Sequence, residues 1–149
     1  MNYILRIAML TAAMSLTAVQ ATAQTGPYQF FALTPCRVVD TRGAIATNGG
    51  PGLGTAVRNF AIRGNCGVPT GAKAVSINVT VTNATNGSWL TLWPSGLAQP
   101  FVSTINFDSA TTALANGAIV GVSTSTNDLS VRNAIGSVHV IIDVTGYYQ

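Results

Sequence analysis

Two tryptophans, Trp89 and Trp93, are the residues whose type and spacing most directly suggest ligand binding in this 149-residue chain. They lie in a segment with the composition of a β-strand, so they share one face, roughly 13 Å apart at the usual rise of a strand. If Leu90 and Leu92 face the core, both indoles point outward and can stack on sugar rings, as in flat carbohydrate-binding surfaces. The alternative is that a loop or the N-terminal strand covers them, because exposed large apolar groups are unusual.

The ionisable residues show no catalytic pattern. A hydrolase needs a nucleophile, a base and an orienting group, or two carboxylates flanking the scissile bond. His139 is the single histidine, and in a strand it would lie on the face opposite its neighbours Val138 and Val140. The chain also lacks the Gly-x-Ser-x-Gly motif of a nucleophile elbow. We therefore expect no catalytic residue and no cofactor.

The acidic residues are interpreted as structural. Asp40 and Arg42 would point the same way along a strand, which favours charge-assisted hydrogen bonds to neighbouring backbone or to Asp143. An acid pair or a calcium site formed by Asp40 and Asp143 is the alternative. Calcium needs six or more oxygen ligands, usually from clustered carboxylates, and the sequence has no Asp-x-Asp loop. We expect polar structural roles for these three residues and no metal site.

The two cysteines, Cys36 and Cys66, are predicted to form a disulfide, because an exported chain passes through an oxidising compartment. Such a bridge would stabilise the fold by about 3 to 4 kcal/mol in the chain-entropy picture. Two buried thiols are the alternative. A zinc site is not expected, since two separated cysteines and one histidine do not supply a tetrahedral ligand set.

The N-terminal segment 1–23 has the features of a cleavable signal peptide. Arg6 supplies a positive charge, an apolar run spans 7–19, and residues 21–23 place alanines where a signal peptidase reads. The run is shorter than the roughly 20 apolar residues of a membrane span. A retained anchor or a buried helix is the alternative. We expect a mature domain over 24–149, secreted, extracellular or periplasmic, with no membrane span after cleavage.

Charge is scarce, with seven basic and four acidic residues making up 7% of the sequence. The basic residues are scattered, so no stripe forms that could neutralise successive phosphates, and nucleic acid is not an expected partner. The polar surface must instead consist of Thr, Ser, Asn and Gly. Such a surface suits extracellular β-domains, which can pack side by side with little electrostatic repulsion.

The elements that position these residues are predicted to be strands. In 73–82, valines and isoleucine alternate with hydroxyl and amide side chains, which indicates a half-buried antiparallel strand. Asn86-Gly87 predicts a hairpin through which 88–93 returns antiparallel to it. Short strands at this spacing, without helices, predict an all-β antiparallel β-sandwich or jelly roll of eight or nine strands. The expected strands are 30–33, 36–41, 57–62, 73–82, 88–93, 102–107, 118–122, 129–133 and 138–147.

Several motifs follow one another in a specific order: PCRVVDTR (35–42), CGVP (66–69), SINVTV (76–81), LTLWPSG (90–96), QP (99–100), STIN (103–106), ANGA (115–118) and IDVTGYY (142–148). In this order they resemble a recurring bacterial secreted module, which occurs alone, in tandem, or attached to cell-wall hydrolases. The resemblance implies an extracellular β-sandwich accessory module without an assigned activity, and it adds no catalytic residues.

These observations predict a non-enzymatic extracellular module with a structural, adhesive or matrix role at the bacterial surface. Its expected partners are cell-surface or matrix components, possible glycans among them, or further copies of itself. A carbohydrate-binding module that uses Trp89 and Trp93 is the main alternative. An enzyme whose site has no visible pattern, or a small inhibitor that uses the glycine-rich loop 43–54, are further alternatives.

Overall fold

The computed structural model describes residues 26–110, 112–124 and 127–149, so the predicted signal peptide 1–23 lies outside the described residues. The described chain consists of strands joined by turns and loops, and none of it forms a helix with the length and hydropathy needed to cross a membrane. The strands are β1 (Phe30–Asp40), β2 (Arg58–Phe60), β3 (Ala74–Thr82), β4 (Ser88–Pro94), β5 (Ile105–Phe107), β6 (Ala113–Gly121), β7 (Leu129–Asn133) and β8 (His139–Tyr148).

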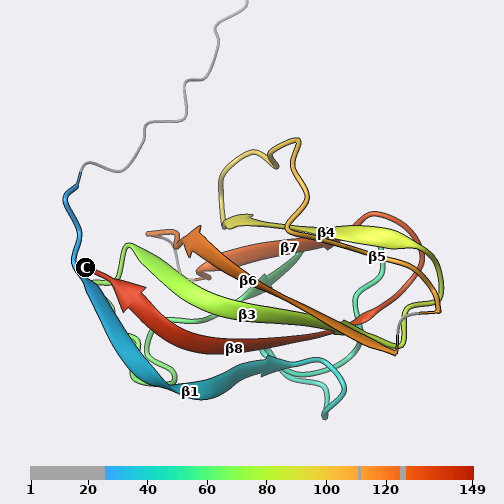
Figure 1. Cartoon of the computed structure of the whole chain (residues 1–149), viewed down its shortest axis with the longest axis horizontal. Coiled ribbons are helices and arrows are strands. Elements are labelled where there is room, and N and C mark those ends of the chain that lie inside the picture. The colour runs from blue at the N-terminus through green and yellow to red at the C-terminus, as the bar shows by residue number, and fades with distance from the viewer. Residues whose placement is uncertain (1–25, 111, 125–126) are drawn as a thin grey trace, which may run out of the picture.

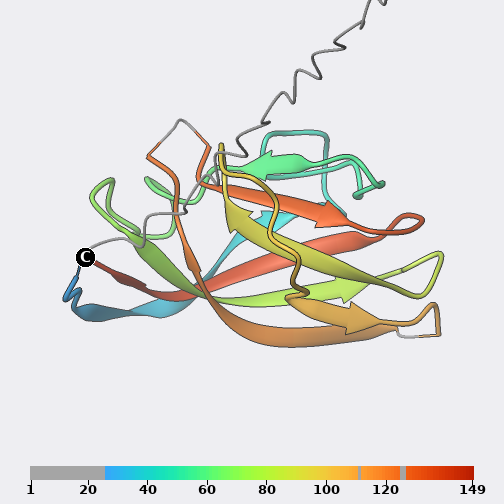
Figure 2. The same ribbon diagram turned by 90° about the horizontal axis from the view of Figure 1, so that it is seen from above.

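The eight strands form two four-stranded antiparallel sheets packed as a sandwich, as the sequence predicts (Figures 1 and 2). One sheet has the order β1-β8-β3-β6 and the other has the order β2-β7-β4-β5. Consecutive strands alternate between the sheets, except that β4 and β5 are neighbours in one sheet. This winding is that of a jelly roll, in which the first and last strands of the chain lie side by side.

Period-two alternation places the core between the sheets. On β3, Val75, Ile77, Val79 and Val81 are buried, whereas the residues between them are only partly buried. The opposite sheet contributes buried side chains such as Phe60, Leu90 and Leu129. Each aliphatic or aromatic side chain removed from water stabilises the fold by about 1.5 to 3 kcal/mol, so this layer is the main source of stability.

The predicted hairpin at Asn86-Gly87 is wrong. β3 pairs with β6 and β8, whereas β4 pairs with β5 and β7, so the segment 83–87 crosses from one sheet to the other. The crossing turns at Asn83, which has φ of 54°, and it is tied to the crossing between β7 and β8 by the Thr85 N–H bond to the Ser137 carbonyl at 2.9 Å. Alternation shows which face of a strand is buried, but not which strand is its neighbour.

Several strand boundaries also differ from those expected, most of all those of β1 and β6. β1 runs through Pro35 as one strand, because the proline lies on an edge strand within a register shift between Ala32 and Cys36. β6 begins at Ala113 rather than at 118, and it pairs with β3 over nine consecutive residues. Its Ala-Asn-Gly composition has little intrinsic strand preference, so this pairing decides its conformation.

The predicted disulfide between Cys36 and Cys66 is confirmed, with the two Cα atoms 5.6 Å apart. Cys36 belongs to β1, and Cys66 lies in the turn that follows β2, where its φ is 52°. The bond therefore fastens an edge strand of one sheet to the chain that leaves an edge strand of the other.

Candidate functional site

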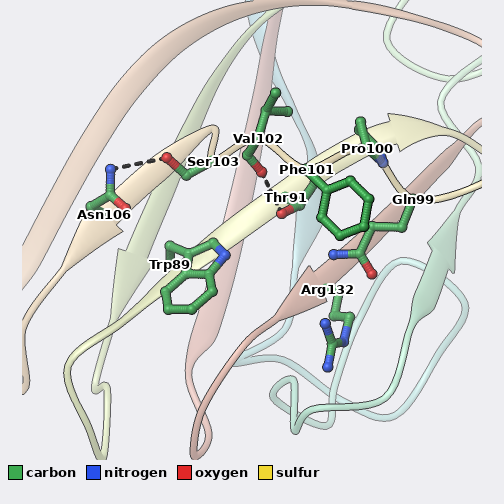
Figure 3. A pocket seen from close by; sticks show the side chains of 9 residues that line it. All are labelled: Trp89, Thr91, Gln99, Pro100, Phe101, Val102, Ser103, Asn106 and Arg132. Carbon is green, nitrogen blue, oxygen red and sulfur yellow. Dashed lines mark hydrogen bonds between the residues drawn. The ribbon is translucent and has the colours of Figure 1, made fainter.

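A hollow of about 700 Å³ on the outer face of the β2-β7-β4-β5 sheet is the candidate site (Figure 3). It is formed by one face of β4, by single residues of β5 and β7, and by the loop 95–104. We call it the Trp89 groove. Its lining residues are Trp89, Thr91, Gln99, Pro100, Phe101, Val102, Ser103, Asn106 and Arg132.

Strand register places the floor of the groove. Trp89 and Thr91 are two residues apart on β4 and so share its outer face. Asn106 of β5 is directly opposite Trp89, and Arg132 of β7 is directly opposite Thr91. Directly opposed residues of an antiparallel pair project from the same face, so three neighbouring strands present these four side chains together.

The wall of the groove is the loop 95–104, which rises from the end of β4 (Figure 1). The loop folds back along β4 and is held there by hydrogen bonds. The Thr91 hydroxyl donates to the carbonyl of Val102 at 2.8 Å, and the Leu92 N–H donates to the hydroxyl of Thr104 at 3.1 Å. This arrangement presents the fully exposed ring of Phe101 beside the face that carries Trp89.

The two predicted ligand-binding tryptophans have different environments. Trp89 is 41% exposed and lines the groove, whereas Trp93 is only 5% exposed and does not line it. The indole N–H of Trp93 donates to the carbonyl of Leu97 at 3.0 Å, so the loop covers this end of β4. Leu90 and Leu92 face the core. Of the two alternatives left open by the sequence, Trp89 is exposed, whereas Trp93 is covered by the loop.

Several polar groups in the Trp89 groove have hydrogen-bonding capacity to spare. Within the described part of the chain, the side chains of Trp89 and Gln99 make no hydrogen bond, and Arg132 uses only Nε, which donates to the Thr55 carbonyl at 3.1 Å. Asn106 donates from Nδ2 to the Ser103 hydroxyl at 3.1 Å, which leaves its carbonyl oxygen to accept. Donors, acceptors and two aromatic rings therefore lie together, and the lining contains no carboxylate.

The groove residues beyond Trp89 were not singled out from the sequence. Gln99 and Pro100 belong to one of the motifs of the resemblance, but no pattern there indicates ligand binding. Phe101 follows them in a loop, where no periodicity applies. Arg132 could be placed on this face only from the register between β4 and β7, which the sequence does not show.

The predicted structural polar residues lie in a chain of alternating charges on the outer side of β1 and β8. Arg37 donates to Asp143 from Nε at 2.8 Å and from Nη2 at 3.2 Å, and its Nη1 lies 3.6 Å from Asp40. Arg42 binds Asp40 through Nε at 2.9 Å and Nη2 at 2.7 Å. Arg37 thus stands between the two carboxylates. The hydrogen bonds from Arg42 lower the pKa of Asp40 to about 2, from an ordinary 3.8.

His139 is tied to the end of β1. Its Nδ1 lies 3.0 Å from the carbonyl oxygen of Thr41 and 3.3 Å from the Thr41 hydroxyl. The Thr41 hydroxyl in turn accepts the Val140 N–H at 2.8 Å. Among the described residues, no carboxylate hydrogen-bonds to this imidazole, and no group of three or more His, Cys, Asp or Glu side chains could hold a metal ion.

A structural residue that sequence reasoning did not single out is Asp128, which is 2% exposed. One of its carboxylate oxygens accepts the backbone N–H of Ile62 at 2.6 Å and that of Arg63 at 2.7 Å. The other accepts Nε of Arg63. The carboxylate therefore fastens the chain that leaves β2 to the start of β7.

Neither a scan of protein-family models nor a search of curated proteins found a match to this chain. The fold and the geometry define its class: a jelly-roll β-sandwich with a disulfide and an aromatic groove open on one sheet.

Proposed function

We propose that this protein is an exported, non-enzymatic module that attaches to glycans of the bacterial surface or matrix through the Trp89 groove. The observation that carries the proposal is the meeting of Trp89 and Phe101 with the uncommitted polar groups of Gln99, Asn106 and Arg132. Sugar rings present apolar C–H faces and hydroxyl rims, so a site for them combines aromatic surface with a few convergent polar groups.

Export is supported by two independent features. The segment 1–23 has the composition of a signal peptide, and the disulfide is typical of proteins that fold in an oxidising compartment. The motif order that resembles a bacterial secreted module agrees with both. An adhesive or matrix role follows from this location together with a nearly uncharged surface, which allows modules to pack closely.

Binding is favoured over catalysis by the contacts of the ionisable groups. Asp40, Asp128 and Asp143 are each hydrogen-bonded to an arginine, and none of them lines the groove. The positive charge there belongs to Arg132, whose guanidinium has no carboxylate partner among the described residues. A cationic side chain in the floor of the groove favours sugars that carry a carboxylate, such as uronic acids, because arginine pairs with carboxylates through two parallel N–H bonds.

The test is a glycan array followed by affinity measurements on Trp89→Ala and Phe101→Ala. Each substitution removes a stacking ring from an exposed position, so we expect binding to weaken about 5-fold to 30-fold while the melting temperature stays unchanged. Leu97→Ala is the matched control, because Leu97 is an exposed residue of the same loop that does not line the groove. Arg132→Gln should weaken binding of acidic glycans more than that of neutral ones.

Two results would contradict the proposal. One is a wild-type protein that binds no glycan on the array or in polysaccharide pull-downs. The other is glycan binding that the Trp89 and Phe101 substitutions leave at wild-type strength, which would place the glycan elsewhere on the sandwich.

A further inference from the structure

The four edge strands of the sandwich differ in how well they are protected against pairing with another chain. Each sheet ends in two strands with one unpaired side: β1 and β6 in one sheet, and β2 and β5 in the other. An unpaired edge exposes backbone N–H and C=O groups that can accept a further strand. Proteins normally block such edges with shortness, proline, charge or bulges.

Three of the edges are blocked in these ways. β2 and β5 are only three residues long, so they offer little backbone for a further strand. β1 is longer, but it contains Pro35 and the charged Arg37, and its pairing with β8 is interrupted by two register shifts. Each of these features opposes the addition of a strand.

The fourth edge, β6, has none of these protections. It pairs with β3 over nine residues without a register shift, and it contains neither proline nor a charged residue. Two of its apolar side chains are exposed, Leu114 at 39% and Ile119 at 64%. In the part of the chain that the structure describes, β3 is its only paired strand, and a side-chain bond from Asn116 to the Thr104 carbonyl at 2.7 Å ties it to the region before β5.

We propose that β6 docks antiparallel against β6 of a second copy of this chain, with a two-fold axis at Gly117. The two β1-β8-β3-β6 sheets then join into one sheet of eight strands. This goes beyond the proposed glycan binding and does not depend on it, because the Trp89 groove lies on the outer face of the other sheet.

The sequence of β6 is complementary to itself in this register. On the outer face, Ile119 of each copy is opposite Ala115 of the other, so a large side chain meets a small one on both sides of the axis. On the inner face, Leu114 is opposite Val120 and Asn116 is opposite Ala118. A Cβ built at Gly117 meets nothing within 4 Å, so no side chain covers the outer face of β6 at this position.

The absence of charge also favours a second copy over a different partner. No charged residue on β6 can select an acidic or basic peptide, and self-pairing brings no like charges together. Isologous pairing through a two-fold axis is the commonest way in which identical subunits associate. A contact made mainly by one strand is smaller than the roughly 1,200 Å² of a stable interface, so the dimer should form only at high protein concentration.

The proposal is tested by sedimentation equilibrium, which measures mass as a function of concentration. The full chain is expressed, and the recovered protein is used. We expect the wild type to shift from monomer mass to twice that mass as concentration rises, and Ile119→Lys to remain monomeric. Ile135→Lys is the matched control, because Ile135 is 48% exposed in the turn between β7 and β8, away from β6, and should dimerise like the wild type. A wild type that stays monomeric, or a dimer that Ile119→Lys leaves intact, overturns the proposal.

Cross-linking tests the register and does not depend on how Ile119→Lys folds. Residues opposite each other at the axis have Cα atoms about 4.5 to 5.5 Å apart, within the range of a disulfide. Gly117→Cys should therefore yield a covalent dimer under mild oxidation. Ala113→Cys should not, because residue 113 is opposite 121 of the other copy and far from its own counterpart. Equal cross-linking of both variants, or of neither, contradicts this register.

Discussion

At the scale of single residues, the buried carboxylate of Asp128 should matter more for stability than any surface charge. Asp128→Ala would leave two backbone N–H groups and the Arg63 guanidinium without this carboxylate. Breaking a buried ion pair by removing one member typically costs about 3 to 5 kcal/mol. We therefore expect the free energy of unfolding, measured by denaturant titration, to fall by that amount in Asp128→Ala.

The control for Asp128 is Asp143→Ala, whose carboxylate pairs with the half-exposed Arg37. Surface pairs contribute about 0 to 1 kcal/mol, so this variant should unfold close to the wild-type midpoint. Equal losses in the two variants would mean that burial does not distinguish the pairs, contrary to the role assigned to Asp128.

The pH dependence of stability should carry a contribution from Asp40. Its pKa is about 2 in the folded protein, held down by Arg42, against an ordinary 3.8. Because the folded pKa is the lower one, the contribution is complete above about pH 4 and is lost as the pH falls through 2. The pair lies near the surface, so we expect only about 1 kcal/mol. Denaturant titration should therefore find Asp40→Asn less stable than the wild type by that amount at pH 6, and almost equal to the wild type at pH 2. A constant difference across this range would exclude the linkage.

At the scale of elements, strand existence was predictable from the sequence, whereas strand neighbours were not. The alternation in β3 correctly predicts its buried valines, because it follows directly from the two-residue repeat of a strand. The Asn86-Gly87 dipeptide does not form the expected hairpin, because the packing of two sheets overrides a local turn preference. The jelly-roll order depends on contacts between residues far apart in sequence, which no short motif encodes.

In the candidate site, too, the strand residues were predictable from the sequence, whereas the loop residues were not. The alternation along β4 predicts that Trp89 lies on the outer face, because the leucines on either side of Thr91 face the core. The burial of Trp93 and the exposure of Phe101 depend on how the loop 95–104 folds back, which is decided by individual hydrogen bonds such as that from Thr91 to Val102. Loops lack the periodicity that makes strands predictable, and they contribute much of this groove.

At the scale of the whole molecule, the disulfide connects folding to the compartment in which the protein folds. The bond closes a loop with a sequence separation of 30 and fastens parts of both sheets, so its reduction should cost about 3 to 4 kcal/mol. That is a large share of the roughly 5 to 15 kcal/mol by which a domain of this size is stable. Export to an oxidising compartment would therefore be needed for full stability.

Denaturant titration with and without a thiol reductant measures this contribution. We expect the wild type to lose about 3 to 4 kcal/mol on reduction, whereas Cys36→Ser combined with Cys66→Ser should be equally weak under both conditions, since it has no bond to reduce. A free-thiol assay on the protein recovered from the medium or periplasm should find both cysteines oxidised. The same chain without residues 1–23 is retained in a reducing cytoplasm, and there the assay should find both cysteines free. Reduced cysteines in exported protein, or a wild type whose stability is insensitive to reductant, would separate the disulfide from export and remove one of the two supports for an extracellular role.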